Sequence, residues 1–544
     1  MSPRTLLPTR ADWLPGLRAP AADLTAGVIV ALVALPLALG FGISSGLGAG
    51  AGLATAVVAG AVAAIFGGSR FQVSGPTGAM TVVLVPIAHE HGASGVLTVG
   101  LLAGLMLVVL AFAGVGRAVR YMPAPVLEGF TAGIAVVIAL QQVPAALGIE
   151  DATGDKVWTV AVDAVLHYLG NPGVIAPATA ALVAGAVLLG GRRMPKLPVA
   201  LAAVVAATVL AGLFDLDLTR IGAIPSGLPA PGLDFVHPGR LGALIVPALA
   251  VAALAALESL LSATAADSMA VGTRHDPDRE LFGQGLANIA APLFGGVPAT
   301  GAIARTAVNV RAGARTRLAA LTHAAVLAGI VFCAAPLVSH IPLAALAGVL
   351  LATTIRMVET AAIVAIARAA KGDALIMAVT FAVTVALDLV TAVAAGIGIA
   401  MLLALRAVAK EARLEQVPLD EDSRAILAEE HALLRDHIVA YRIDGPLFFA
   451  AAHRFLLELV EVADVRVVVL RMSRVTALDT TGALVLADAI GKLEHHGILV
   501  LVSGVRADHR PLLDTLGALP ADDRVFDHTP DAIAYARTRL TATS

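Results

Sequence analysis

The sequence predicts a polytopic α-helical membrane protein with a small α/β domain at its C-terminal end. Hydrophobic residues make up 58% of the 544 residues and charged residues only 14%, whereas a soluble domain carries roughly a quarter charged residues. The mean hydropathy is +0.87. Apolar residues gather in runs that approach the length of about 20 residues needed for a helix to cross a bilayer core. After Lys410 the sequence changes to charged stretches and short β-branched runs.

We predict about fourteen membrane segments, several of them too short to span a bilayer alone. They are separated by proline, glycine or charged residues and lie at 24–45, 50–66, 77–89, 94–116, 124–147, 173–191, 197–214, 241–267, 281–293, 301–312, 316–338, 342–367, 373–389 and 391–409. The first run is longer than the apolar core of a signal peptide, so we interpret it as a retained membrane helix. The predicted domains are an N-terminal segment (1–22), a transmembrane region (23–410), a linker (411–436) and a C-terminal domain (437–544).

Arginine and lysine are distributed unevenly between the loops. If the N-terminus is cytoplasmic, the outside loops carry only Lys156, Arg220 and Arg240, and the inside loops are much richer in basic residues. This asymmetry follows the positive-inside rule and favours an even number of crossings. We therefore expect a multi-pass protein of a bacterial-type inner membrane with both termini in the cytoplasm.

Several classes of protein are disfavoured. The single cysteine, Cys333, cannot form an internal disulfide or a cysteine-based metal site. The net charge of −3 and the lack of a basic block argue against nucleic acid as a partner. The sequence holds no recognisable hydrolase, nucleotide-binding or metalloprotease motif, so we do not expect an enzyme, a metal site or a cofactor.

The C-terminal region has the pattern of an α/β domain. Short β-branched runs at 437–443, 465–472 and 498–502 alternate with helical stretches at 450–463 and 482–496. Strands that alternate with helices indicate such a domain, and about 100 residues can bury a core of their own.

Two places in the membrane region resemble each other. Residues 66–68 and 294–296 both read Phe-Gly-Gly, a proline follows each, and the apolar run restarts with Thr-Gly-Ala at 77–79 and 300–302. Short, glycine- and proline-interrupted segments at matching places in two halves indicate the binding site of a transporter. The simpler alternative is a pair of ordinary kinks in a tight helix bundle.

The repeat also predicts the charge of the ligand. A helix that begins inside the membrane directs unpaired N–H groups and the positive end of its dipole at the space before it. Two such ends facing each other would bind a small anion. Pro76 suits a helix start, and Thr77 and Thr300 can add hydroxyl donors.

Charged side chains lie inside the predicted apolar segments. Glu258 falls within 241–267, and an acidic group at that depth is a functional candidate by default. It could take up a proton when an anion binds, hold a sodium ion, or serve only as a hydrogen-bonded carboxylic acid between helices. Arg305 could add positive potential or form an interhelical salt bridge.

The stretches 34–43, 74–78, 258–262 and 294–306 resemble the SulP family of anion transporters, and the C-terminal domain resembles a STAS domain. The resemblance implies two inverted seven-segment repeats arranged as a core and a gate domain, a homodimer, and an elevator-like movement. It also implies an anionic substrate such as sulfate, bicarbonate, chloride or a dicarboxylate.

Carried over by motif, the resemblance assigns functional residues. Those assigned to the substrate are Pro36, Leu37, Thr77, Gly78, Ala299, Thr300 and Gly301, and those assigned to ion coupling are Glu258 and Ser262. Sodium-coupled relatives carry aspartate and threonine at the last two positions, so the departures favour protons over sodium. Leu37 is apolar where some relatives have glutamine, which removes one potential hydrogen bond.

In the STAS-like domain, Asp479-Thr480-Thr481-Gly482 occupies the place of a phosphorylation loop. A phosphate on Thr480 would add nearly two negative charges at a helix start. The interpretation we prefer is that Thr480 simply caps the helix.

Three functional hypotheses follow. The first is a secondary transporter, either a proton symporter or an anion exchanger. The second is an uncoupled anion channel on the same scaffold, and the third is a membrane-anchored sensor that signals through the STAS-like domain. The carboxyl group of Glu258 favours coupled transport, because a pore needs no titratable group. The sequence leaves the identity of the anion open.

Overall fold

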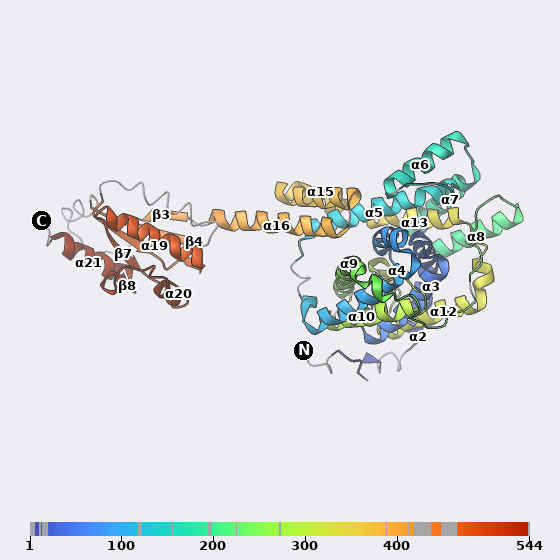
Figure 1. Ribbon diagram of the computed structural model, residues 1–544, viewed down its shortest axis with the longest axis horizontal. Helices are drawn as coiled ribbons and strands as arrows, with labels where there is room; N and C mark the ends of the chain where they lie inside the picture. Colours follow the sequence, from blue (N-terminus) through green and yellow to red (C-terminus); the bar gives the residue numbers. More distant parts are fainter. Residues whose placement is uncertain are drawn as a thin grey trace. The chain divides into compact units, whose positions relative to one another are not determined.

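The computed structural model describes residues 6–9, 12–13, 20–117, 122–154, 156–193, 198–224, 226–270, 274–387, 389–411, 413–417, 437–447 and 465–541. The chain divides into two compact units, Met1–Ile397 and Gly398–Ser544, and each is considered by itself (Figure 1).

The first unit is helical, as predicted. Its helices are α2 (Pro20–Ser44), α3 (Ala49–Phe66), α4 (Gly78–Phe112), α5 (Ala124–Leu147), α6 (Val157–Gly170), α7 (Ile175–Arg193), α8 (Val199–Leu213), α9 (Leu241–Met269), α10 (Pro277–Leu293), α11 (Ile303–Arg311), α12 (Leu318–Val338), α13 (Leu343–Met357), α14 (Thr360–Ala369), α15 (Lys371–Ala386) and the first part of α16 (Leu389–Glu411). Within the described residues, seven helices are long and apolar enough to cross a membrane, and shorter apolar helices accompany them. The count of fourteen segments stays a prediction.

Helix α4 contains a kink at Gly92, whose backbone is not helical (φ 69°, ψ −173°), so the predicted runs 77–89 and 94–116 are two helices that meet there. Two other segments differ from the sequence-based assignment. The run 342–367 is divided into α13 and α14. Helix α6 was not predicted, because Asp163 and His167 interrupt its apolar run and only Ala161 and Ala164 are buried.

The helices of this unit pack as two groups. In one group, which we call the core helices, α2, α3, α4, α9, α10, α11 and α12 pack against one another. In the other, which we call the gate helices, α5, α7, α8, α13 and α15 do so. Close backbone approach is one means of packing: a Cβ atom at Gly42 of α2 would lie 2.8 Å from the Cα atom of Gly52 on α3, so only glycine permits this contact.

The second unit contains a six-stranded sheet. Its elements are β3 (Arg413–Val417), β4 (Ile438–Leu447), β5 (Val467–Arg471), β6 (Val475–Leu478), α19 (Thr480–His495), β7 (Leu499–Ser503), α20 (Arg510–Thr515), β8 (Val525–Phe526) and α21 (Thr529–Thr541). The strand order is β3-β4-β5-β7-β8, with β6 also on β4, and all pairs are parallel except β3 with β4.

Helices cover both faces of this sheet. Val468 and Leu470 of β5 pack with α19 and α20, whereas Val467 and Val469 pack with α21. Adjacent side chains of a strand point to opposite faces, which explains why β5 is apolar at each position from Val467 to Leu470. The predicted strands near 437–443, 465–472 and 498–502 are confirmed, and the predicted helix 450–463 lies outside the described residues.

Strand β3 lies within the range 411–436 that the sequence indicates as a linker. It pairs antiparallel with β4, from Arg413 opposite Asp444 to Val417 opposite Ala440. The first part of that range therefore belongs to the sheet. Its charged, helix-prone composition concealed the strand, because an edge strand has only one neighbour to pair with and tolerates charged side chains.

Asp12 joins the N-terminal segment to the core helices. Its carboxylate lies 3.0 Å from Arg279 Nη2 at the start of α10 and 3.7 Å from Arg317 Nε just before α12. Arg317 also donates to the carbonyls of Ala64 and Gly67 at the end of α3. Burial raises the pKa of Asp12, but hydrogen bonds from Arg279 and the Thr9 backbone, together with the charges of both arginines, outweigh this effect and lower it to about 2.

We predict that Asp12→Asn destabilises the protein by about 3 kcal/mol, because Arg317 is left buried without its charged partner. A depressed carboxyl pKa contributes stability above the unfolded value of 3.8 and loses it as the pH falls toward 2. The loss should therefore be the same at pH 5, 6.5 and 8. Thermal unfolding of the detergent-purified variant measures it, and an unchanged melting temperature would contradict the prediction.

Candidate functional site

Two short strands bring the two Thr-Gly-Ala segments together. β1 (Ser74–Gly75) pairs antiparallel with β2 (Thr300–Gly301), with Ser74 opposite Gly301 and Gly75 opposite Thr300. The N–H of Ala302 extends the pairing by donating to the carbonyl of Val73 at 3.0 Å. Helix α4 begins three residues after β1 and α11 begins two residues after β2. The two helix starts are therefore neighbours, as the sequence repeat predicts.

Thr77 links the start of α4 to Glu258 on α9. It is the N-cap residue of α4, and its hydroxyl oxygen accepts from the N–H of Met80 at 3.4 Å. The same hydroxyl donates to Glu258 Oε2 at 2.9 Å. Thr300 and Arg305 also interact with the Glu258 carboxyl group. Residues from α4, α9 and α11 thus converge on one acidic side chain.

Two serines that follow Glu258 on α9 join this helix to β2 and α11. The Ser259 hydroxyl lies 3.1 Å from Thr300 Oγ1 and accepts from the N–H of Gly301 at 3.0 Å. Ser262 donates to Thr306 Oγ1 at 3.1 Å. Ser259 was not among the predicted residues, although it is a polar side chain next to Glu258 in an apolar helix, and that signal could have identified it.

Arg305 brings a buried positive charge to the same place. Its side chain is almost fully buried, and Nη2 donates to the carbonyl of Pro76 at 2.6 Å. Its Nη1 occupies the space in which a Cβ atom at Gly75 would lie, only 2.7 Å away. Gly75 has a φ of 154°, so both its conformation and its contact with Arg305 require glycine.

Pro36 and Leu37, the residues of α2 that the sequence assigns to the substrate, have different surroundings from the other predicted binding residues. Pro36 and Leu37 are buried, and Leu37 belongs to an apolar cluster with residues of α3, α12 and α13. The side chains that cover the start of α4 are instead Ile138 of α5 and Phe41 of α2. A Cβ atom at Gly78 would lie 2.2 Å from Ile138 Cδ1 and 3.1 Å from Phe41 Cε1. Any role of Pro36 and Leu37 in binding stays a prediction.

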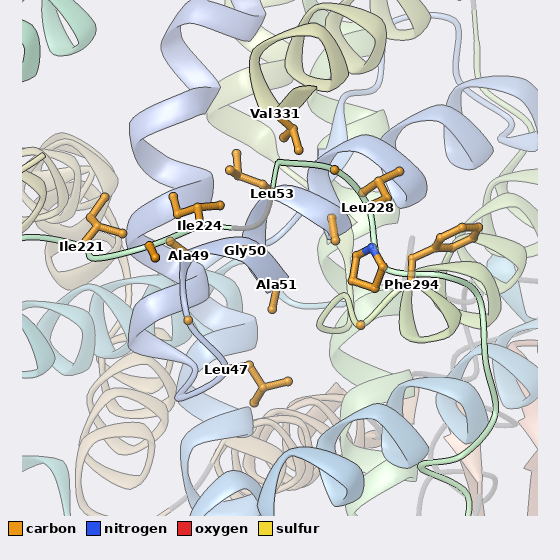
Figure 2. A pocket seen from close by; sticks show the side chains of 16 residues that line it. Leu47, Ala49, Gly50, Ala51, Leu53, Ile221, Ile224, Leu228, Phe294 and Val331 are labelled. Carbon is orange, nitrogen blue, oxygen red and sulfur yellow. The ribbon is translucent and has the colours of Figure 1, made fainter. Parts of the chain in front are cut away.

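A cavity of about 320 Å³ lies beside the second Phe-Gly-Gly turn. Figure 2 shows apolar side chains around it, from the start of α3, from the segment after α8, from Phe294 and from Val331 on α12. Thr77, Glu258 and Thr300 are not among its lining residues. The cavity is therefore separate from the cluster of polar residues around Glu258.

Asp479 provides the cap of α19 in the second unit. Its side chain accepts from the N–H of Gly482 at 2.7 Å, whereas Thr480 is the first helical residue and is exposed. The preferred interpretation of Thr480 as the cap is therefore wrong, because an aspartate one residue earlier takes that role. Phosphorylation of Thr480 stays a prediction.

Many apolar helices around two broken ones, followed by an α/β domain, define a multi-pass membrane transporter. A model of the sulfate permease family matches residues 21–380, and a model of the STAS domain matches residues 432–532. The chain therefore belongs to the sulfate permease family, which is the SulP family that its sequence motifs resemble. Members of this family are transporters, so the protein is an anion transporter and not an enzyme.

Individual relatives agree with this assignment. The putative sulfate transporter YvdB of Bacillus subtilis (strain 168) is 35% identical over 515 residues, which cover 93% of this chain and 96% of that protein. The transmembrane domain of a cyanobacterium bicarbonate transporter, BicA, is 34% identical, with a TM-score of 0.64 over 69% of this chain and 98% of that chain. SLC26A9 has the same fold, with a TM-score of 0.82 at 18% identity over 98% of this chain and 93% of that chain.

We predict that Gly301→Ala destabilises the protein by about 1–3 kcal/mol, the usual cost of overpacking a dense interior. The added Cβ would lie 2.1 Å from Gln72 Nε2 and 3.1 Å from the Cα atom of Ser259. Gly329→Ala in α12 is the matched control, because no atom lies within 4 Å of its added Cβ. Thermal unfolding compares the two variants, and equal melting temperatures would show that β2 is not tightly packed.

Proposed function

We propose that this protein is a secondary active transporter whose substrate is sulfate, bicarbonate or a dicarboxylate. The anion binds between the starts of α4 and α11. The observation that carries the proposal is the antiparallel pairing of β1 with β2, which sets the two helix starts side by side. Thr77, Gly78, Ala299, Thr300 and Gly301 are the proposed binding residues.

Backbone dipoles and one arginine favour an anion at this place. The N-terminal end of a helix carries a partial positive charge and unpaired N–H groups. α4 presents such an end at Gly78, and the N–H groups of its first turn follow directly after Thr77. The buried Arg305 guanidinium adds a full positive charge. A site of this kind recognises negative charge more than shape, so the three classes of anion stay open.

Glu258 is the proposed proton-coupling group. An ionised carboxylate about 4 Å from an anion would repel it by about 4 kcal/mol at an effective dielectric constant of 20. Protonation of Glu258 removes this repulsion, so anion and proton would bind together. Ser262, the second residue assigned to coupling, donates to Thr306 and so ties α9 to α11. We favour proton coupling over sodium because Glu258 and Ser262 depart from the aspartate and threonine that sodium-coupled relatives carry.

Release of the anion requires movement between the two helix groups. Ile138 belongs to the gate helices and lies against Gly78 of the core helices. A shift of the core helices along the gate helices would separate these residues and open the start of α4. This supports an elevator-like movement, in which the binding residues travel together.

We further propose that both termini are cytoplasmic, that the membrane is the inner membrane of a bacterial-type cell, and that the protein is a homodimer. The uneven distribution of basic residues supports the orientation. The homodimer rests on the family resemblance alone.

We predict that Glu258→Gln abolishes the response of uptake to a proton gradient. Gln cannot take up a proton but has nearly the same shape. In proteoliposomes, an inward proton gradient should raise uptake of radiolabelled sulfate, bicarbonate or fumarate by the parent protein and leave uptake by the variant unchanged.

Glu90→Gln is the control for this experiment, because Glu90 is an exposed carboxylate with 77% of its side chain accessible. It should respond to the gradient as the parent does. A Glu258→Gln variant that still accumulates the anion under a proton gradient would show that another group carries the proton.

A further inference from the structure

One face of α10 carries three buried polar side chains at intervals of four residues. They are Glu280, Gln284 and Asn288, each at most 1% exposed. Residues four apart lie on the same face of a helix. We call these three residues the α10 ladder. Burying such a row of polar side chains among apolar helices costs free energy of folding, and hydrogen bonds offset this cost.

Glu280 holds the first Phe-Gly-Gly turn and the residues after it. Its Oε2 accepts from the N–H groups of Gly68 at 2.8 Å and Ser69 at 2.9 Å. Its Oε1 accepts from Gln72 Nε2 at 2.7 Å and Gln284 Nε2 at 3.0 Å. The chain leading into β1 is therefore fixed to α10 by a carboxylate with four donors.

Gln284 holds β1 itself. Its Nε2 donates to Ser74 Oγ at 2.6 Å as well as to Glu280. Ser74 is the residue that pairs with Gly301 of β2. Close packing supports this contact, because a Cβ atom at Gly283, the preceding residue, would lie 2.4 Å from the Cα atom of Gly67.

Asn288 holds the chain that leads into β2. Its Oδ1 accepts from the N–H of Ala299 at 2.8 Å, and its Nδ2 donates to the carbonyl of the same residue at 2.8 Å. Nδ2 also lies 2.9 Å from the carbonyl of Gln284. One amide group thus satisfies both backbone groups of Ala299, which is one of the proposed binding residues.

We infer that the α10 ladder comprises positioning residues that set the spacing of the two helix starts and thereby the affinity for the anion. This inference rests on the proposed binding site between α4 and α11. The ladder does not touch the anion. It fixes β1 through Glu280 and Gln284 and β2 through Asn288 from a single rigid helix, so a change on α10 alters the distance between the two anion-binding ends.

The test measures whether substitutions in the α10 ladder change KM for the anion while leaving the maximal rate of uptake nearly unchanged. Asn288→Asp keeps an acceptor for the N–H of Ala299 but places a second oxygen against its carbonyl. We expect it to raise KM for the anion about ten- to hundredfold, by analogy with the loss of affinity when residues that orient metal ligands are altered, while the maximal rate of uptake changes less than about twofold. Gln284→Met tests the same role at β1 by removing the donor to Ser74.

Asp23→Asn is the matched control. Asp23 is also a fully buried carboxyl group with several donors: it accepts from the N–H groups of Arg315 and Thr316 and from the Thr316 hydroxyl, at 2.6–3.0 Å. These bonds join α2 to the segment before α12 and do not reach β1 or β2. The control should lower the melting temperature without raising KM.

The assay uses the full chain in proteoliposomes, with radiolabelled sulfate, bicarbonate or fumarate, whichever the parent protein carries. A KM for Asn288→Asp and Gln284→Met no higher than that of Asp23→Asn, at a similar loss of melting temperature, would overturn the positioning role. Thr300→Val tests the proposed function separately. If it also leaves KM unchanged, or if the parent carries none of the three anions, the proposed binding site fails and the role of the ladder fails with it.

Discussion

The structure depends on one constraint: every backbone N–H and C=O group inside the membrane needs a partner, because lipid supplies none. The non-helical segments before α4 and α11 lack the hydrogen bonds of a continuous helix, so other groups must supply partners. The backbones of β1 and β2 pair with each other. Asn288 hydrogen-bonds to both backbone groups of Ala299, and Glu280 accepts from the N–H groups of Gly68 and Ser69. The buried polar side chains of the core helices are therefore the condition under which the breaks can exist.

The same arrangement decides which charges the site can hold. Arg305 is kept in place by the carbonyl of Pro76, and Glu258 by the hydroxyl of Thr77, so a fixed positive group and a titratable acidic group lie beside the same helix start. An anion is attracted by the first and repelled by the ionised form of the second. In the proposed mechanism, protonation of Glu258 sets the balance between attraction and repulsion, and a site made mainly of backbone would thereby couple an anion to a proton.

Local patterns in the sequence were sufficient for some of these features and insufficient for others. The repeated Phe-Gly-Gly segments and the acidic Glu258 stand out in apolar surroundings, and the structure brings the ends of the two repeats together beside Glu258. The contacts of Asn288 and the cover that Ile138 places over Gly78 could not be predicted in this way, because they join residues far apart in the chain or on different helices. Strand β3 and helix α6 were missed for a simpler reason, since charged residues obscured their periodicity.

The distribution of polar contacts explains how the site could move as one body. Ion pairs link Asp12 to Arg279 and Arg317, and hydrogen bonds follow the α10 ladder. These polar contacts join core helices to one another or to the N-terminal segment. Contacts between core and gate helices are largely apolar, such as Gly40 against Leu350, with the hydrogen bond from Gln142 to Ser44 as an exception. Directional bonds resist sliding, whereas apolar surfaces exchange one contact for another at little cost. Core helices that are joined by hydrogen bonds and packed on apolar gate helices would suit the proposed elevator-like movement, in which the two helix starts keep their spacing.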